Sequence, residues 1–260
     1  MYIEDRQREI LGIIKKNGSV SVNTLVAQFG KSHETIRRDL RRLEKLGMVK
    51  RTHGGAELCE SVPSDYVTET PLGFRLGVNA EKKLMIAKKA AEFVKNEDVI
   101  LLDDSTTVSG MLRYLPRDYS LTIITNSILI VNQLQGYDND ANWTVVCLGG
   151  ILRSKSCSLT GFLAVKALAS FRPNKLFFSC GGIDSKGNLT EGNLSMVEVK
   201  REFLTSCKES YLLLDDSKID NPTPVNLAEM RDVDYLIVSE ADAKVTERIK
   251  KMGVKSIISV

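Results

Sequence analysis

The chain of 260 residues has few of the side chains that hold metal ions, and they are not spaced to do so. Its five cysteines are odd in number and show no C-x-x-C spacing, and its two histidines lie far from any cysteine pair. A structural metal site is therefore not expected, and we predict no cofactor.

Long apolar runs are also missing. None approaches the ~18 residues that cross a bilayer, and the chain opens on Glu4, Asp5 and Arg6 rather than on a signal-peptide pattern. We therefore expect a cytoplasmic protein with reduced thiols and no membrane partner. The apolar and charged fractions are those of a soluble globular protein, and the length predicts two domains.

Positive charge is concentrated at one end of the chain. Residues 1–57 contain 12 Lys and Arg against 7 Asp and Glu, whereas the remainder contains 24 against 26. Within residues 31–51 the count is 8 against 3. A short basic module of this kind is typical of nucleic-acid binding.

The segment from Ser32 to Gly47 predicts a helix with one apolar and one cationic side. Ser32 is a good N-cap, and Gly47 is a good helix stop. The apolar residues at helical spacing are Ile36, Leu40, Leu43 and Leu46. Glu34, Arg38, Arg41, Arg42 and Lys45 fall on the opposite side, and Arg37 lies on the flank. Such a helix suits the DNA major groove, although an ordinary solvated helix face is the alternative.

The neighbouring segments favour the DNA-binding interpretation. Two helices, over residues 4–16 and from Ser21, precede the basic helix, which gives helix-turn-helix order. After it, residues 48–53 predict a strand, Gly54-Gly55 a hairpin turn with positive φ, and residues 56–58 a returning strand.

A basic hairpin in this position forms a wing beside the groove. Arg51 and His53 are expected to contact phosphate, and packing of His53 at the turn is the alternative.

These residues resemble the winged helix-turn-helix of the DeoR family of bacterial regulators. The resemblance is carried by Arg8, the run Ser32-x-x-Thr35-Ile36-Arg37-Arg38-Asp39-Leu40 and the wing Arg51-x-His53-Gly54-Gly55-Ala56. It implies that Arg37 and Arg38 contact DNA, while Asp39 braces an arginine. The residues expected at the duplex are Ser32, His33, Glu34, Thr35, Arg37, Arg38, Arg41, Arg51 and His53.

The rest of the chain predicts an α/β domain. Residues 58–79 form a linker without sustained periodicity, and a helix follows Asn79. Short apolar runs then alternate with helical segments, which is typical of strands buried on both faces of a parallel sheet. These runs are residues 99–102, 121–124, 145–148, 176–179, 211–214 and 235–238. The predicted division is 1–57, 58–79 and 80–260.

Polar residues follow five of these strands. In an open parallel sheet, ligands bind beyond the carboxyl ends of the strands. Ser105, Thr106 and Thr107 follow the first strand at a helix N-terminus, where orphan N–H groups favour an anion. Glycines and hydroxyls after strands are common loop chemistry, but five such strand exits together favour a small, polyhydroxylated, anionic ligand.

The resemblance extends over this half, because DeoR-type sensor domains look like relatives of ribose-5-phosphate isomerase and glucosamine-6-phosphate deaminase. It implies that Ser105, Thr106 and Thr107 hold a phosphate that Lys218 also reaches. The other expected effector-site residues are Asp103, Thr125, Asn126, Gly149, Gly150, Arg153, Gly182, Asp184, Glu198 and Lys200. The family usually has glycine at position 105, so this serine narrows the phosphate site or adds a hydroxyl contact.

The predicted fold is thus α/β, with an N-terminal winged helix-turn-helix and a C-terminal α/β sensor domain. The leading hypothesis is a repressor of a sugar-utilisation operon that binds double-stranded DNA as a homo-oligomer, a dimer or tetramer, and responds to a phosphorylated sugar. A sugar-phosphate isomerase or deaminase with an accessory N-terminal domain is the alternative. An RNA-binding regulator is disfavoured, because a helix enters the major groove of B-form DNA more readily than that of RNA.

Overall fold

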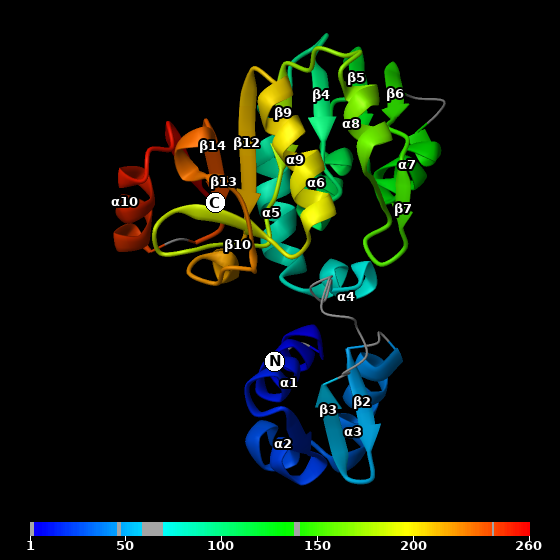
Figure 1. The fold of residues 1–260 in the computed structure, drawn as a ribbon, viewed down its shortest axis with the longest axis vertical. Helices are drawn as coiled ribbons and strands as arrows, with labels where there is room; N and C mark the ends of the chain where they lie inside the picture. Colours follow the sequence, from blue (N-terminus) through cyan, green and yellow to red (C-terminus); the bar gives the residue numbers. More distant parts are fainter. Residues whose placement is uncertain (1–2, 46–47, 59–69, 138–140, 241) are drawn as a thin grey trace. The chain divides into compact units, whose positions relative to one another are not determined.

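The computed structural model describes residues 3–45, 48–58, 70–137, 141–240 and 242–260 (Figure 1). The predicted apolar residue Leu46 and helix stop Gly47 lie outside the described residues. The chain divides into two compact units, Met1–Asn79 and Ala80–Val260.

The first unit begins with three helices and a small antiparallel sheet of strand order β1-β3-β2. The helices are α1 (Ile3–Asn17), α2 (Val22–Phe29) and α3 (His33–Lys45). The strands are β1 (Ser19–Ser21), β2 (Val49–Thr52) and β3 (Gly55–Leu58). The helix order and the β2–β3 hairpin confirm the predicted winged helix-turn-helix. Strand β1 was not predicted, because three residues are too few to show a period of two.

Two serines begin the helices of this unit as the sequence predicts. The Ser21 hydroxyl accepts a hydrogen bond from the Thr24 amide at 3.0 Å, and Ser32 accepts one from the Thr35 amide at 3.2 Å. Gly30 ends α2 in the left-handed conformation with φ 60°. The turn between α2 and α3 is therefore determined by the glycine that ends α2 and the serine that begins α3.

The apolar stripe of α3 is the centre of this unit. Ile36, Leu40 and Leu43 are completely buried among residues of α1 and α2, including Ile10 and Leu25. The opposite side of α3 is left to the solvent.

The wing turn differs from the prediction. Thr52 pairs with Gly55, so the loop consists of His53 and Gly54, and neither Gly54 nor Gly55 has a positive φ. Gly55 instead lies in β3 against β1. A Cβ atom on Gly55 would lie 1.9 Å from the carbonyl oxygen of Val20. Close backbone approach therefore explains this glycine.

A short helix interrupts the segment predicted as a linker. Helix α4 (Leu72–Gly77) belongs to the first unit, and its Phe74 is buried with the apolar residues of α1–α3. The helix expected after Asn79 is α5 (Ala80–Ala91), at the start of the second unit.

The second unit is built on a seven-stranded parallel sheet of order β15-β14-β12-β9-β4-β5-β6. The strands are β4 (Val99–Leu102), β5 (Leu121–Thr125), β6 (Trp143–Cys147), β9 (Lys175–Phe178), β12 (Glu209–Leu214), β14 (Tyr235–Val238) and β15 (Ser256–Ser259). All six predicted runs are confirmed as strands of this sheet. Strand β15 at the chain end was missed.

Helices cover both faces of the sheet, which is why its strands are uninterrupted apolar runs. One face packs against α8 (Phe162–Leu168), α9 (Leu194–Ser206) and α10 (Ala243–Lys251). The other packs against α5, η1 (Gly110–Arg113) and α7 (Ile128–Leu134). Figure 1 shows α9 in front of the sheet and α5 behind it.

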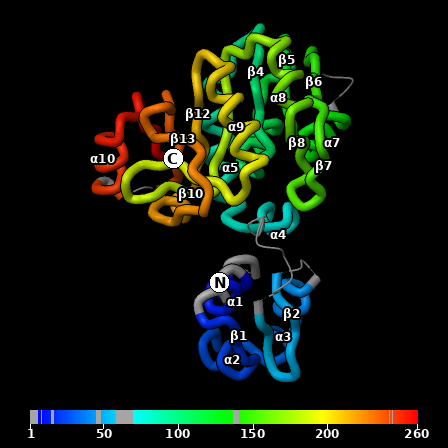
Figure 2. Tube along the Cα trace, viewed as in Figure 1, coloured from blue at the N-terminus to red at the C-terminus, as the bar shows by residue number. Residues whose placement is uncertain are grey.

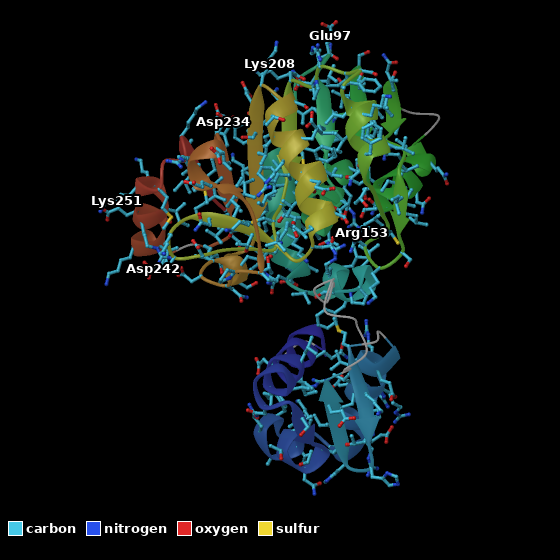
Figure 3. All side chains as sticks on the ribbon, in the orientation of Figure 1. Glu97, Arg153, Lys208, Asp234, Asp242 and Lys251 are labelled. Carbon is cyan, nitrogen blue, oxygen red and sulfur yellow. The ribbon has the colours of Figure 1, made fainter. Side chains whose placement is uncertain are left out.

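The strand order reverses between β4 and β9, which are neighbours in the sheet but distant in the chain. Such a switch point opens a crevice at the carboxyl ends of the strands. Figure 3 shows Glu97, Lys208 and Asp234 at the edge where strands begin, and Arg153 toward the opposite edge, where they end.

Short strands surround those carboxyl ends. Strands β10 (Gly182–Ile183), β11 (Asn188–Glu191) and β13 (Val225–Glu229) form an antiparallel sheet, and β7 (Ile151–Arg153) pairs with β8 (Ser158–Thr160). Figure 2 shows β7 and β8 side by side.

The state of the cysteines and the length and polarity of the helices bear on the sequence predictions. Cys147, Cys157, Cys180 and Cys207, the four cysteines that the structure describes, are all free thiols. Within the described ranges, every helix is too short or too polar to cross a membrane.

We expect Gly55→Ala to destabilise the first unit by about 1–3 kcal/mol, because the added methyl group overlaps the Val20 carbonyl. Differential scanning calorimetry of the full chain measures this loss. Gly54→Ala is the matched control, because a Cβ atom there meets nothing within 4 Å. Equal melting temperatures for the two variants would contradict the close approach.

Candidate functional site

Helix α3 presents a cationic surface to solvent. Arg37, Arg38, Arg41 and Arg42 are all exposed, whereas the apolar residues between them are buried. The exposed Glu34 carboxylate accepts a hydrogen bond from Arg41 at 2.5 Å. This surface matches the cationic side that the sequence predicts.

The first turn of α3 carries the other predicted DNA-facing residues. The hydroxyls of Ser32 and Thr35 lie 2.9 Å apart, and the ring nitrogen Nε2 of His33 lies 3.0 Å from Oδ1 of Asn23. Ser32 and His33 are exposed, and Thr35 is partly buried. These side chains therefore lie together at the N-terminal end of the cationic surface.

A buried ion pair fixes α3 on α1. The Arg6 side chain donates to both carboxylate oxygens of Asp39, at 2.6 and 3.2 Å, and Gln7 donates to the same carboxylate at 2.9 Å. The side chains of Arg6 and Asp39 are only 6% and 3% exposed. Asp39 thus braces an arginine as expected, and that arginine lies on α1.

Arg51 has a structural role in the wing. Its guanidinium donates to the carbonyl of Gly55 at 3.2 Å and to that of Arg37 at 3.5 Å, and its amide donates to Glu44. Arg51 therefore ties the hairpin to α3. His53 is exposed in the loop, as a phosphate contact requires.

A polar cluster lies at the carboxyl ends of β4 and β9 in the second unit. Asp103, directly after β4, is completely buried. Its carboxylate accepts from the amides of Ser105 and Ser179, at 2.9 and 3.0 Å, and lies 3.1 Å from the ammonium of Lys200. Asp103 therefore links the two strand ends that flank the switch point.

Lys200 lies at the centre of this cluster. Its ammonium donates to the Ser179 carbonyl at 2.7 Å and to the Glu191 carboxylate at 2.5 Å. Burial opposes the charged form, but the carboxylates of Glu191, Asp103 and Asp104 outweigh it and raise the pKa of Lys200. Lys200 is therefore cationic at neutral pH.

Lys218 adds a second cation from another strand exit. It ends the short helix η3 (Asp216–Lys218) after β12, and its ammonium donates to the Ser179 hydroxyl at 3.0 Å and the Cys180 carbonyl at 2.7 Å. Lys218 is partly exposed, unlike Lys200. The structure thus brings Asp103, Lys200 and Lys218 together around Ser179.

The loop after β4 shows what serine does at position 105. The Ser105 hydroxyl accepts from the Val108 amide at 3.2 Å and caps α6 (Thr106–Ser109). The hydroxyl proton is still available to an anionic acceptor. Thr107 is buried and Thr106 is partly exposed in the same turn.

Two buried amides lie beside the β7–β8 hairpin. Asn126 donates to the Leu159 carbonyl at 3.0 Å, and Asn193 accepts from Arg153 at 3.1 Å. Oδ1 of Asn126 and Nδ2 of Asn193 are buried without a hydrogen-bond partner among the described residues. Thr125, just before Asn126, accepts from the Ser127 amide at 3.0 Å. An unsatisfied acceptor and an unsatisfied donor thus flank one hairpin.

Several expected effector-site residues have other roles in the structure. Asp184 accepts from the Lys186 and Asn188 amides within the β10–β11 turn. A Cβ atom at Gly150 or Gly182 would lie 2.5 or 2.0 Å from a backbone oxygen, so both glycines allow close packing. Gly149 is exposed after β6.

Glu198 is exposed on α9, and the carboxylates that contact Lys200 belong to Asp103 and Glu191. The sequence reasoning did not identify Glu191, Ser179 or Asn193. For Ser179 the sequence did carry a signal, because it is the polar last residue of the predicted apolar run 176–179.

Two family models match the chain. The DeoR-like helix-turn-helix domain matches residues 6–62, and the DeoR C terminal sensor domain matches residues 78–240. A helix-turn-helix joined to a sensor domain defines a DNA-binding transcriptional regulator that responds to a small molecule. The chain belongs to the DeoR family of transcriptional regulators, and not to the sugar-phosphate enzymes that were the alternative.

Relatives match along nearly the full length. An uncharacterized HTH-type transcriptional regulator of Bacillus subtilis is 36% identical over 237 residues, 91% of this chain and 89% of the relative. The L-fucose operon activator of Haemophilus influenzae is 32% identical over 95% of this chain and 94% of its own. The glycerol-3-phosphate regulon repressor of Escherichia coli is 32% identical over 88% of each.

Among solved structures, ribose 5-phosphate isomerase A of Methanocaldococcus jannaschii matches with a TM-score of 0.40 and 18% identity, over 54% of this chain and 55% of its own.

We expect Lys200→Met to lower the free energy of unfolding of the second unit by about 3–5 kcal/mol, because it leaves buried carboxylates uncompensated. Urea unfolding followed by fluorescence of Trp143, the single tryptophan, measures the change. Lys208→Met, at an exposed position after α9, should shift it by no more than about 0.5 kcal/mol. A stability of Lys200→Met equal to that of the control would contradict the central role of Lys200.

Proposed function

We propose that the protein represses an operon for the use of a sugar or sugar derivative, and that a phosphorylated sugar controls it from the carboxyl ends of β4, β5, β9 and β12. The observation that carries the proposal is the group of polar residues near those strand ends, most of which are buried. It combines two cations, several hydroxyls and two amides with an unsatisfied atom, one of which, Asn193, begins α9.

The relatives support the sugar-related role. Their names describe an L-fucose operon activator, a glycerol-3-phosphate regulon repressor and a lactose phosphotransferase system repressor. These names concern uptake or use of carbohydrates and related phosphates. Two of the three are repressors, which supports repression for this chain.

The DNA contact is assigned to the cationic side of α3. Arg37 and Arg38 are exposed on the helix, while the Asp39–Arg6 pair fixes its orientation. A helix anchored in this way can enter the major groove without losing further conformational freedom. Arg41, Ser32, His33, Glu34 and Thr35 would border the same groove, with His53 at the adjacent backbone.

The phosphate is assigned to the loop after β4 and to Lys218. Ser105 and Thr106 offer hydroxyl protons at the first turn of α6, and Lys218 supplies a positive charge that is partly accessible. Lys200 already contacts carboxylates and holds the loop in place. The residues that we expect to bind the phosphate are thus separate from the ion pairs of Lys200 with Asp103 and Glu191.

The sugar is assigned to the amides beside the β7–β8 hairpin. The Asn126 oxygen can accept from a hydroxyl, and the Asn193 nitrogen can donate to one. Binding there changes DNA affinity only if the two arrangements of the regulator bind the sugar phosphate with different affinities.

We expect Arg37→Ala and Arg38→Ala each to weaken operator binding about 10- to 100-fold, because each removes a contact worth ~1–3 kcal/mol. Gel shifts should use a duplex that the wild-type protein selects from a random-sequence pool. Arg172→Ala, at an exposed position of the second unit, is the control. Unchanged affinity of both α3 variants would remove the helix from the DNA interface.

For the effector, we expect that a sugar monophosphate releases the wild-type protein from the same duplex and that Lys218→Met needs at least about 10 times more of it. A hydrogen bond to a charged group is worth ~1.5–3 kcal/mol. A titration with pentose and hexose phosphates measures this. Lys208→Met, at the opposite edge of the sheet (Figure 3), should respond as the wild type does. Identical response curves for all three proteins would contradict the phosphate assignment.

A further inference from the structure

The first turn of α5 carries a lysine that contacts residues following two strands of the main sheet. The ammonium of Lys82 donates to both carboxylate oxygens of Asp216, at 2.9 and 3.0 Å, and lies 3.5 Å from the carboxylate of Glu240. Asp216 begins η3 after β12, and Glu240 follows β14. Lys82 therefore connects the start of α5 to the chain that leaves both strands.

A second contact fixes Asp216 on the sheet. The Ser239 hydroxyl accepts a hydrogen bond from the Asp216 amide at 3.2 Å and donates one to the Asp216 carboxylate at 3.1 Å. Ser239 is completely buried, directly after β14. The Asp216 carboxylate thus links a buried residue of the sheet to Lys82 of α5.

Lys218, which we assign to the phosphate, lies in the same short helix as Asp216. Its ammonium donates to the Ser179 hydroxyl and the Cys180 carbonyl. A phosphate that binds Lys218 competes with these two acceptors for the three ammonium protons. Because η3 is only three residues long, a shift of Lys218 also shifts Asp216.

The connection between α5 and the first unit is short. Only Val78 and Asn79 lie between the end of α4 and the start of α5. Phe74 of α4 packs with apolar residues of α1–α3, whereas Ile86 of α5 is completely buried in the second unit. Two residues between two packed helices transmit a displacement that a long flexible linker absorbs.

We propose that the Lys82–Asp216 ion pair couples the effector site to the segment that leads to the DNA-binding unit. Phosphate binding at Lys218 shifts η3, the ion pair passes this shift to the first turn of α5, and residues 78–79 pass it to α4. The inference rests on the proposed phosphate contact of Lys218. It adds a positioning residue, Lys82, that we assign neither to the DNA nor to the effector.

The exposure of the ion pair suits this role. The side chains of Lys82 and Asp216 are 35% and 36% exposed, and ion pairs at such positions contribute little to the free energy of unfolding. The pair can therefore form in one arrangement of the regulator and break in another. A contact that differs between two arrangements is what coupling between two sites requires.

Amide hydrogen exchange of the full chain, in chloride and in phosphate buffers of equal pH and ionic strength, tests the inference with inorganic phosphate as the probe. In the wild-type protein we expect phosphate to slow exchange in residues 105–109 and 216–218. We also expect it to change exchange in residues 72–86, from α4 to the start of α5, at least about 5-fold, which is the lower end of typical couplings between sites.

The Lys82→Met variant should keep the response to phosphate at residues 105–109 and 216–218 and lose the response at residues 72–86. Lys82→Arg should restore it, because a guanidinium also pairs with a carboxylate. Lys89→Met is the matched control. Lys89 lies on the same helix and is 36% exposed, but its ion pair is with the nearby Glu92.

Three outcomes would overturn the coupling while leaving the phosphate assignment intact. They are a wild-type response at residues 216–218 without one at residues 72–86, a full response of Lys82→Met at residues 72–86, and loss of that response in Lys89→Met. No wild-type response at residues 105–109 or 216–218 would instead contradict the phosphate assignment, and this inference with it.

Discussion

The buried ammonium of Lys200 holds together strand ends that lie far apart in the chain. It contacts Asp103 after β4, the Ser179 carbonyl after β9 and Glu191 at the end of β11. A parallel sheet whose strand order reverses leaves a crevice at that point. Here a cation that contacts two carboxylates lies at those strand ends, and removing either sign of charge would leave the other buried and uncompensated. The positions of Ser105, Thr106 and Lys218 depend on this arrangement.

A buried ion pair also fixes the arrangement of elements in the first unit. The Arg6–Asp39 pair is buried between α1 and α3, while the arginines on the other side of α3 are exposed. In both units, buried charges fix the backbone and exposed charges remain for a ligand. Arg51 of the wing also serves the fold, unlike the exposed arginines of α3, because its guanidinium donates to backbone carbonyls of the wing and of α3.

The sequence predicted the elements whose patterns are long or chemically specific. The apolar runs became the strands of the main sheet, and Ser21 and Ser32 cap their helices. Short strands such as β1 and β11 escaped prediction, because two to four residues show no period. Of the two carboxylates that contact Lys200, Asp103 was predicted, and Glu191 was missed because it ends β11. Gly55 was correctly singled out but assigned to a turn, because spacing alone does not reveal a close approach between strands.

The central claim is that a phosphorylated sugar binds at the carboxyl ends of the strands around the switch point. Amide hydrogen exchange of the full chain, with and without a panel of sugar phosphates, tests it most directly. The account predicts that an effective sugar phosphate slows exchange in residues 103–109, 125–127 and 216–218. Slowed exchange confined to the opposite edge of the sheet, near Glu97, Lys208 and Asp234, would contradict it.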